Sequence, residues 1–225
     1  MMEFVFLDLD DTILDFHQAE AIAVAKAFRG VGVEPKPALI ARYSQVNKRH
    51  WQMLERGELT REQVLVQRFA CLFAETGLKA DPVACKTLYE DYLSMGHYFI
   101  PGAVELLEYL APKYRLYLAS NGTARVQAAR LDSSGIRRYF SDIFISQEMG
   151  ADKPGAVFFQ RCFARIPGFS PDRGIIIGDS LTSDIRGGNN AGLKTCWFNP
   201  HFQPVTEDVK IDWEIHALGE LKGIL

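Results

Sequence analysis

The sequence has few features of secreted, membrane-spanning or nucleic-acid-binding proteins. Its 225 residues include only four cysteines, none of them in a CxxC pair, and no apolar run long enough to cross a membrane. It also has no block of lysine and arginine, and its formal charge is −3. We therefore predict reduced thiols, a cytoplasmic location, a small-molecule substrate, and neither a nucleic-acid nor a membrane partner.

Internal repeats and low-complexity segments are also absent, which indicates a globular protein of one or two domains. Two patterns divide the chain. Residues 17–97 have a helical pattern almost throughout, whereas strands and helices alternate from residue 101 onward. We predict a core domain formed by residues 1–14 and 98–225, and an inserted helical domain formed by residues 15–97.

The alternating part predicts the fold class. Short apolar strands joined by helices are typical of an α/β protein with a Rossmann-like parallel sheet that helices cover on both faces. The insert predicts a four-helix bundle. Thr60 and Gln63 have the spacing of a capping box, and Asp81 stands before Pro82 as a helix cap would.

Polar side chains follow three of the predicted strands. The segments are "FLDLDD", "LASNGT" and "IIIGDS", which contain Asp8 and Asp10, Ser120, and Asp179 respectively. Ligands of open parallel sheets bind beyond the carboxyl ends of the strands. Side chains alternate along a strand, so Asp8 and Asp10 should leave on the same side and face one ligand. Together with Asp179 they could bind a hard cation such as Mg²⁺.

Each segment also has an ordinary structural interpretation. Residues 8–12 could form a turn that caps the next helix, and Ser180 or Asp184 in "GDSLTSD" could cap another. "SNG" is a common turn sequence, and most lysines, including Lys153 in "ADKPG", are solvated. Only the combination of all four segments, in this order, favours a catalytic site.

That combination resembles the haloacid dehalogenase-like hydrolase superfamily, whose four motifs are similar to "DLDDT", "SNG", "KP" and "GDSLTSD" here. The resemblance covers essentially the whole chain, including a helical cap between the first two motifs. It implies that Asp8 attacks phosphorus to form an aspartyl-phosphate and that Asp10 acts as the general acid and base. It also implies that Ser120, Asn121 and Lys153 bind the phosphate.

The resemblance implies a Mg²⁺ cofactor as well. Its ligands would be the Asp8 carboxylate, the Asp10 backbone carbonyl and the Asp179 carboxylate, with Asp184 behind them. The carboxyl group of Asp10 favours a phosphatase over a haloacid dehalogenase, because a phosphate ester has a leaving alkoxide that needs a proton. Asp11 receives no role.

The insert resembles that of the bacterial pyrimidine 5'-nucleotidases, so we expect a nucleoside 5'-monophosphate as substrate. Phe16, Asn47 and Trp51 are candidate contacts to the base, with His50 and Arg68 beside them. Trp51 also has helical spacing with apolar neighbours, which is typical of the core of a bundle. A sugar phosphatase or general small-metabolite phosphatase, a 2-haloacid dehalogenase and a non-catalytic binding protein are the alternatives.

Overall fold

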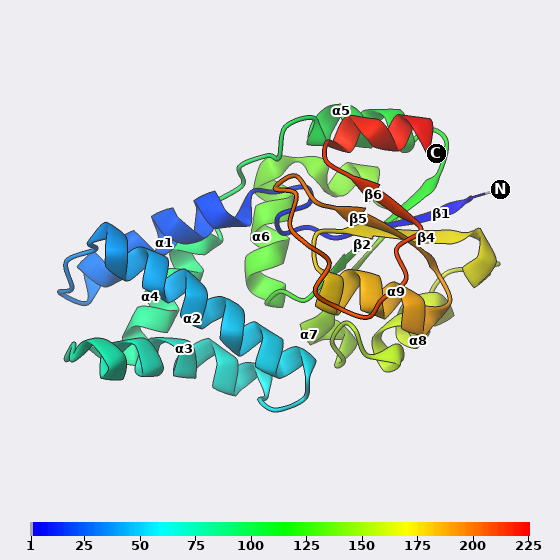
Figure 1. Cartoon of the computed structure of the whole chain (residues 1–225). Coiled ribbons are helices and arrows are strands. Elements are labelled where there is room, and N and C mark those ends of the chain that lie inside the picture. Colours follow the sequence, from blue (N-terminus) through cyan, green and yellow to red (C-terminus); the bar gives the residue numbers. More distant parts are fainter. Residues whose placement is uncertain (1) are drawn as a thin grey trace. The chain divides into compact units, whose positions relative to one another are not determined.

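Six short apolar segments form one parallel sheet in the computed structural model of the chain, which describes residues 2–225. The strand order is β3-β2-β1-β4-β5-β6, so β1 lies between β2 and β4 (Figure 1). Its first residue, Phe4, pairs with Arg115 on one side and with Gly174 on the other. The strands are β1 (Phe4–Leu7), β2 (Arg115–Ser120), β3 (Asp142–Ile145), β4 (Gly174–Gly178), β5 (Lys194–Phe198) and β6 (Trp213–Ile215).

The prediction of a Rossmann-like α/β fold is therefore confirmed, with one strand more than the sequence indicated. β6 was not predicted, because three residues with one buried side chain carry almost no periodic signal. It extends the sheet by pairing in parallel with β5.

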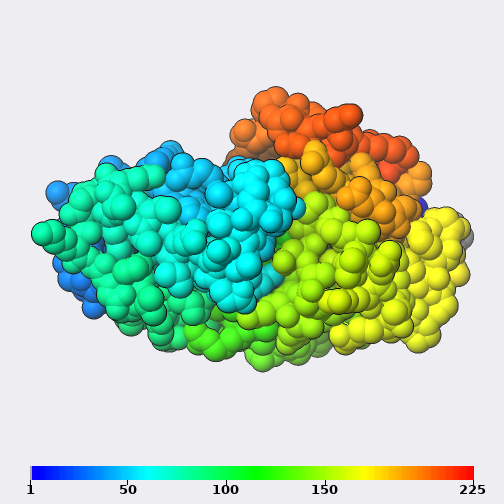
Figure 2. Space-filling view, turned by 90° about the horizontal axis from the view of Figure 1, so that it is seen from below, coloured from blue at the N-terminus to red at the C-terminus, as the bar shows by residue number. Residues whose placement is uncertain are grey.

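The two faces of the sheet bury alternate residues of each strand. Val5 and Leu7 of β1 belong to one apolar cluster, and Phe4 and Phe6 belong to the other. Helices cover both faces of the sheet (Figure 1), and Figure 2 shows in space-filling form the surface on one side, coloured by residue number. The helices of this part are α5 (Ala103–Leu110), α6 (Ala124–Ser134), α7 (Ser146–Met149), α8 (Ala156–Ala164) and α9 (Arg186–Ala191), with short helical turns η1 (Ile136–Tyr139), η2 (Pro171–Arg173), η3 (Leu181–Ile185) and η4 (Leu218–Gly223).

The chain divides into two compact units. One contains the residues up to Asp15 together with Tyr98–Leu225, and the other is Phe16–His97. The sequence analysis placed the corresponding boundaries between residues 14 and 15 and between residues 97 and 98. Residues 2–225 include no helix with both the length and the apolar character that crossing a membrane requires.

The second unit consists of four helices around an aromatic core. Phe28, Tyr43, Phe69 and Tyr89 pack with ring centroids about 5 to 6 Å apart. The capping box of Thr60 and Gln63 is present, and Asp81 caps the helix that begins at Pro82, as predicted. The helices are α1 (Phe16–Gly30), α2 (Pro37–Glu55), α3 (Arg61–Thr76) and α4 (Pro82–Leu93).

Candidate active site

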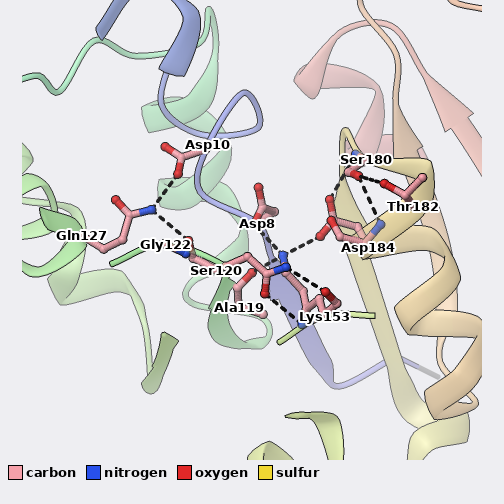
Figure 3. A network of polar contacts seen from close by, with 12 residues as sticks. Asp8, Asp10, Ala119, Ser120, Gly122, Gln127, Lys153, Ser180, Thr182 and Asp184 are labelled. Carbon is pink, nitrogen blue, oxygen red and sulfur yellow. Dashed lines mark hydrogen bonds and ion pairs between the residues drawn. The ribbon is translucent and has the colours of Figure 1, made fainter. Parts of the chain in front are cut away.

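The polar segments identified in the sequence meet at the carboxyl edge of the sheet. Asp8 follows β1, Ser120 ends β2 and Asp179 follows β4. Because these three strands are neighbours and run parallel, their carboxyl ends lie side by side. Figure 3 shows Lys153 between Asp8 and Asp184.

Lys153 is the electrostatic centre of this edge. Its side chain is 1% exposed, and Nζ donates to Asp8 Oδ1 at 2.7 Å, to Asp184 Oδ1 at 2.6 Å and to the Ala119 carbonyl at 2.6 Å. All three ammonium protons therefore have acceptors. Burial lowers the pKa of Lys153, but Asp184 and Asp8 raise it more, so the pKa lies above its ordinary value. The lysine is a fixed, buried positive charge.

Three carboxylates share this region. Asp8, Asp179 and Asp184 each offer an oxygen, and these oxygens lie within 4.8 Å of one another. Burial raises the pKa of Asp8 to about 8, although Lys153 lowers it. Burial, followed by the charges of Asp184 and Asp11, also raises the pKa of Asp179 well above its ordinary value. The three groups carry up to three negative charges, and Lys153 supplies one positive charge.

This donor set fits a hard divalent cation. Mg²⁺ binds oxygen ligands, commonly one or two carboxylates together with water and substrate phosphate. Bound near Asp8 and Asp179, it would offset the carboxylate repulsion that adds to the effect of burial on both pKa values. The structure thus brings together Asp8 and Asp179, two of the three residues that the sequence analysis proposed as Mg²⁺ ligands.

Both oxygens of the Asp184 carboxylate have hydrogen-bond donors within the protein. One carboxylate oxygen accepts from Lys153, and the other accepts from the Ser180 backbone N–H at 3.1 Å. A side chain at Gly178 would collide with the Asp184 carboxylate, so this glycine provides the space that Asp184 occupies. Asp184 therefore positions Lys153 next to Asp8.

The Ser120 hydroxyl is oriented by its neighbours. The side chain is 1% exposed, and Oγ accepts from the Gly122 N–H at 3.2 Å and from Gln127 Nε2 at 2.9 Å. A hydroxyl oxygen has two acceptor positions, so both are used and its own proton is available for donation. Ser120 can therefore donate to an anionic oxygen.

Asn121 makes contacts that the sequence analysis did not anticipate. Its Nδ2 donates to the Lys153 carbonyl at 2.8 Å, and its Oδ1 accepts from the Lys153 N–H at 2.8 Å. This reciprocal pair ties the backbone of Lys153 to the end of β2. Phosphate binding by Asn121 stays a prediction, whereas its contacts within the protein orient Lys153.

The Asp10 carboxylate has different hydrogen-bond partners from the Asp8 carboxylate. Its carboxylate is 27% exposed and forms an ion pair with Arg130, whose side chain is completely buried. Gln127 Nε2 donates to the other Asp10 oxygen at 2.6 Å. The sequence analysis assigned no role to Gln127 or Arg130. The available signal was helical spacing, because Gln127 and Arg130 lie on the same side of α6 as the apolar residues Val126 and Leu131.

The candidate base contacts lie in the four-helix unit. Asn47 is 3% exposed, and both ends of its amide are engaged there, Nδ2 with Glu20 at 2.6 Å and Oδ1 with Arg68 at 2.8 Å. Trp51 is half-buried, with the Arg61 guanidinium 5.6 Å from its ring centroid.

Two further residues complete this group. His50 is buried and its Nδ1 lies 2.8 Å from the Val46 carbonyl, so its ring contacts the backbone of its own helix. Phe16 is half-buried at the start of α1. Contact of Phe16, Asn47 and Trp51 with a substrate stays a prediction.

The chain is similar to known proteins over almost its whole length. The HAD-hydrolase YfnB of Bacillus subtilis is 40% identical over 221 residues, covering 98% of this chain and 94% of YfnB. The pyrimidine 5'-nucleotidase PynA of Streptococcus pneumoniae is 36% identical, covering 99% and 94% of the two chains. The pyrimidine 5'-nucleotidase YjjG of Escherichia coli is 31% identical, covering 99% and 97%.

A solved structure and a family model agree with these relatives. The crystal structure of YfnB bound to magnesium has a TM-score of 0.95 and covers 100% of this chain and 98% of its own. The family model described as haloacid dehalogenase-like hydrolase matches residues 2–192. The chain therefore belongs to the haloacid dehalogenase-like hydrolases.

Proposed function

We propose that the protein is a Mg²⁺-dependent phosphatase that hydrolyses phosphate monoesters through an aspartyl-phosphate on Asp8. The observation that carries this proposal is the excess of carboxylate around Lys153, which suits a divalent cation and a phosphoryl group. The 5'-nucleotidase relatives support a phosphoric monoester hydrolase.

In the first half-reaction, an Asp8 oxygen attacks phosphorus and the bond from phosphorus to the leaving oxygen breaks. Asp10 donates a proton to that oxygen, which then departs as an alcohol. In the second half-reaction, Asp10 takes a proton from water, the water oxygen attacks phosphorus, and the bond to Asp8 breaks. The covalent intermediate divides one difficult displacement into two easier ones.

The residues around Asp8 stabilise charge on the phosphoryl oxygens. Lys153 supplies a fixed positive charge, and the Ser120 hydroxyl has a proton to donate. A Mg²⁺ ion bound to Asp8 and Asp179 would supply further neutralisation of that charge. Asp184 and Asn121 hold Lys153 in place.

For the substrate we propose nucleoside 5'-monophosphates, with pyrimidine nucleotides preferred. The names of PynA and YjjG, together with their coverage of the whole chain, support this choice. The helical unit Phe16–His97 would act as the cap that selects the leaving group. The four free cysteines suit a reducing compartment, so the cytoplasmic location stays our prediction.

A panel of esters tests the proposal. Phosphate release would be measured for pyrimidine and purine 5'-monophosphates, hexose and triose phosphates, with Mg²⁺ and with chelator. We expect a graded series led by pyrimidine nucleotides, because small differences of fit discriminate only about 10-fold to 200-fold. A sugar phosphate that exceeds every nucleotide would contradict the nucleotidase assignment. Halide release from 2-haloacids without phosphatase activity would favour a dehalogenase, and no turnover at all would favour a binding protein.

A further inference from the structure

Two residues of α6 hold both oxygens of the Asp10 carboxylate. Arg130 Nη1 donates to Oδ1, and Gln127 Nε2 donates to Oδ2 at 2.6 Å. The same Gln127 nitrogen donates to Ser120 Oγ at 2.9 Å. Figure 3 shows Gln127 between Asp10 and Ser120, so one amide links the proposed acid to the proposed phosphate donor.

The Gln127 amide can adopt only one orientation in this arrangement. Arg130 Nη1 donates to Gln127 Oε1 at 2.9 Å, which places Nε2 toward Asp10 and Ser120. A reversed amide would direct Oε1 at the Asp10 carboxylate and lose all three hydrogen bonds. Both protons of Nε2 are used, one for each acceptor. The three hydrogen bonds of the Gln127 amide are therefore mutually consistent.

Burial and local sequence support a fixed geometry. Arg130 is 0% exposed and Gln127 is 1% exposed, so neither side chain has solvent as an alternative partner. A side chain at Gly122 would overlap the Gln127 side chain. The glycine of "SNG" thus provides the space through which Gln127 reaches Asp10 and Ser120.

From this network we propose that Gln127 and Arg130 are positioning residues of the reaction, which fix the Asp10 carboxyl group and leave the Ser120 proton free for the phosphoryl group. The proposal rests on the proposed phosphatase function. A general acid acts only within hydrogen-bond reach of the leaving oxygen, and misplacement by about 1 Å can cost about 10²-fold in rate. Holding both Asp10 oxygens removes the rotations that would cause such misplacement.

The proposal predicts a dependence on the leaving group. A nucleoside leaves as an alkoxide that needs the proton of Asp10, whereas nitrophenolate leaves without one at neutral pH. Loosening Asp10 should therefore slow hydrolysis of a nucleotide more than hydrolysis of p-nitrophenyl phosphate. A role in folding alone would lower both rates by the same factor.

The test is the variant Gln127→Met, which keeps the length of the side chain and removes its hydrogen bonds. We expect kcat for uridine 5'-monophosphate to fall about 10²-fold and kcat for p-nitrophenyl phosphate to fall about tenfold or less. The ratio of the two rates does not depend on the fraction of folded enzyme. The matched control is Gln160→Met, at an exposed glutamine of α8, which should leave the ratio unchanged.

Variants of Arg130 provide a second test of the proposal. Arg130→Met should shift the ratio in the same direction, and Arg130→Lys, which keeps a buried positive charge beside Asp10, should restore part of it. Equal losses for both esters in Gln127→Met and Arg130→Met, or no loss in either, would overturn the proposal while leaving the phosphatase function intact. A wild-type protein that hydrolyses neither ester would overturn both.

Discussion

Two clusters of buried polar side chains, one in each unit, differ in their balance of charge. In the helical unit, Glu20 and Arg68 are joined by Asn47, which bonds to both. This cluster contains one carboxylate and one guanidinium, and the Ser44 hydroxyl adds a hydrogen bond of 2.5 Å to Glu20. Its charges cancel within the protein.

At the edge of the sheet the ionisable groups are not balanced one to one. Asp8, Asp179 and Asp184 gather around Lys153, so carboxylates outnumber the ammonium group. Burial raises carboxyl pKa values in both clusters, including that of Glu20, which Ser44 and Asn47 lower in turn. Burial of carboxyl groups is therefore common to both clusters, and the excess of carboxyl groups at the sheet edge is the feature on which we base the proposal of a ligand site there.

The largest effect should come from removing the nucleophile. Asp8→Asn should reduce turnover to below about a hundredth of the wild-type rate, since losing even one acid or base usually costs 10²-fold to 10⁴-fold. The fold should remain, because one of the mutually repelling carboxylates is gone. Steady-state kinetics and circular dichroism check this, with Asp208→Asn at an exposed position as control. Activity near the wild-type level would show that Asp8 is not the nucleophile.

Removing a second carboxylate should act mainly on metal affinity. Asp179→Ala should weaken Mg²⁺ binding at least about tenfold, because even outer partners of a metal site contribute that much. Titration calorimetry measures the affinity directly, and Asp208→Ala provides the control. Chelator should silence the wild-type enzyme reversibly. Full activity in chelator would show that the reaction does not require Mg²⁺.

Disrupting the cluster of Glu20, Asn47 and Arg68 should lower the stability of the fold and leave metal affinity unchanged. Asn47→Ala leaves Glu20 and Arg68 buried without their bridge, so the free energy of unfolding should fall by about 2 to 4 kcal/mol. Mg²⁺ affinity should not change. Denaturant unfolding measures the loss, and Gln45→Ala at an exposed position of α2 is the control. Unchanged stability combined with a raised KM for nucleotides would instead favour the base contact predicted from the sequence.

A final effect concerns pH in the metal-free protein. The pKa of Asp8 is about 8 in the folded state and 3.8 ordinarily, so folding favours its protonated form. This contribution to stability is fully present below about pH 4 and is lost as the pH rises to about 8. Thermal unfolding in chelator should show the decline, and Mg²⁺ or Asp8→Asn should reduce it. A Tm that rises with pH across this range in all three samples would contradict the predicted fall in stability.

The sequence was most informative about features that neighbouring residues define. The alternation of strands and helices predicted the parallel sheet, and three polar strand ends predicted where Asp8, Ser120 and Asp179 would meet. The sheet is confirmed, and the three residues lie at one edge of it because neighbouring parallel strands have their carboxyl ends side by side.

Contacts between distant residues could not be predicted in the same way. Gln127 and Arg130 lie 117 and 120 residues from Asp10, and their role depends on how α6 packs against the sheet. The amides of Asn121 and Asn47 can bind a ligand or the protein, and sequence spacing does not choose between these. In the structure both have partners within their own unit.

The central claim is that the excess of carboxylate at the sheet edge serves covalent phosphoryl transfer to Asp8. Its most direct test is to quench the enzyme during turnover of an isotopically labelled nucleotide with Mg²⁺, and to locate the acyl-phosphate by peptide mass spectrometry. The account predicts label on Asp8 in the wild-type enzyme and none in Asp8→Asn. Label on another carboxylate, or continued turnover of Asp8→Asn with no labelled peptide, would contradict it.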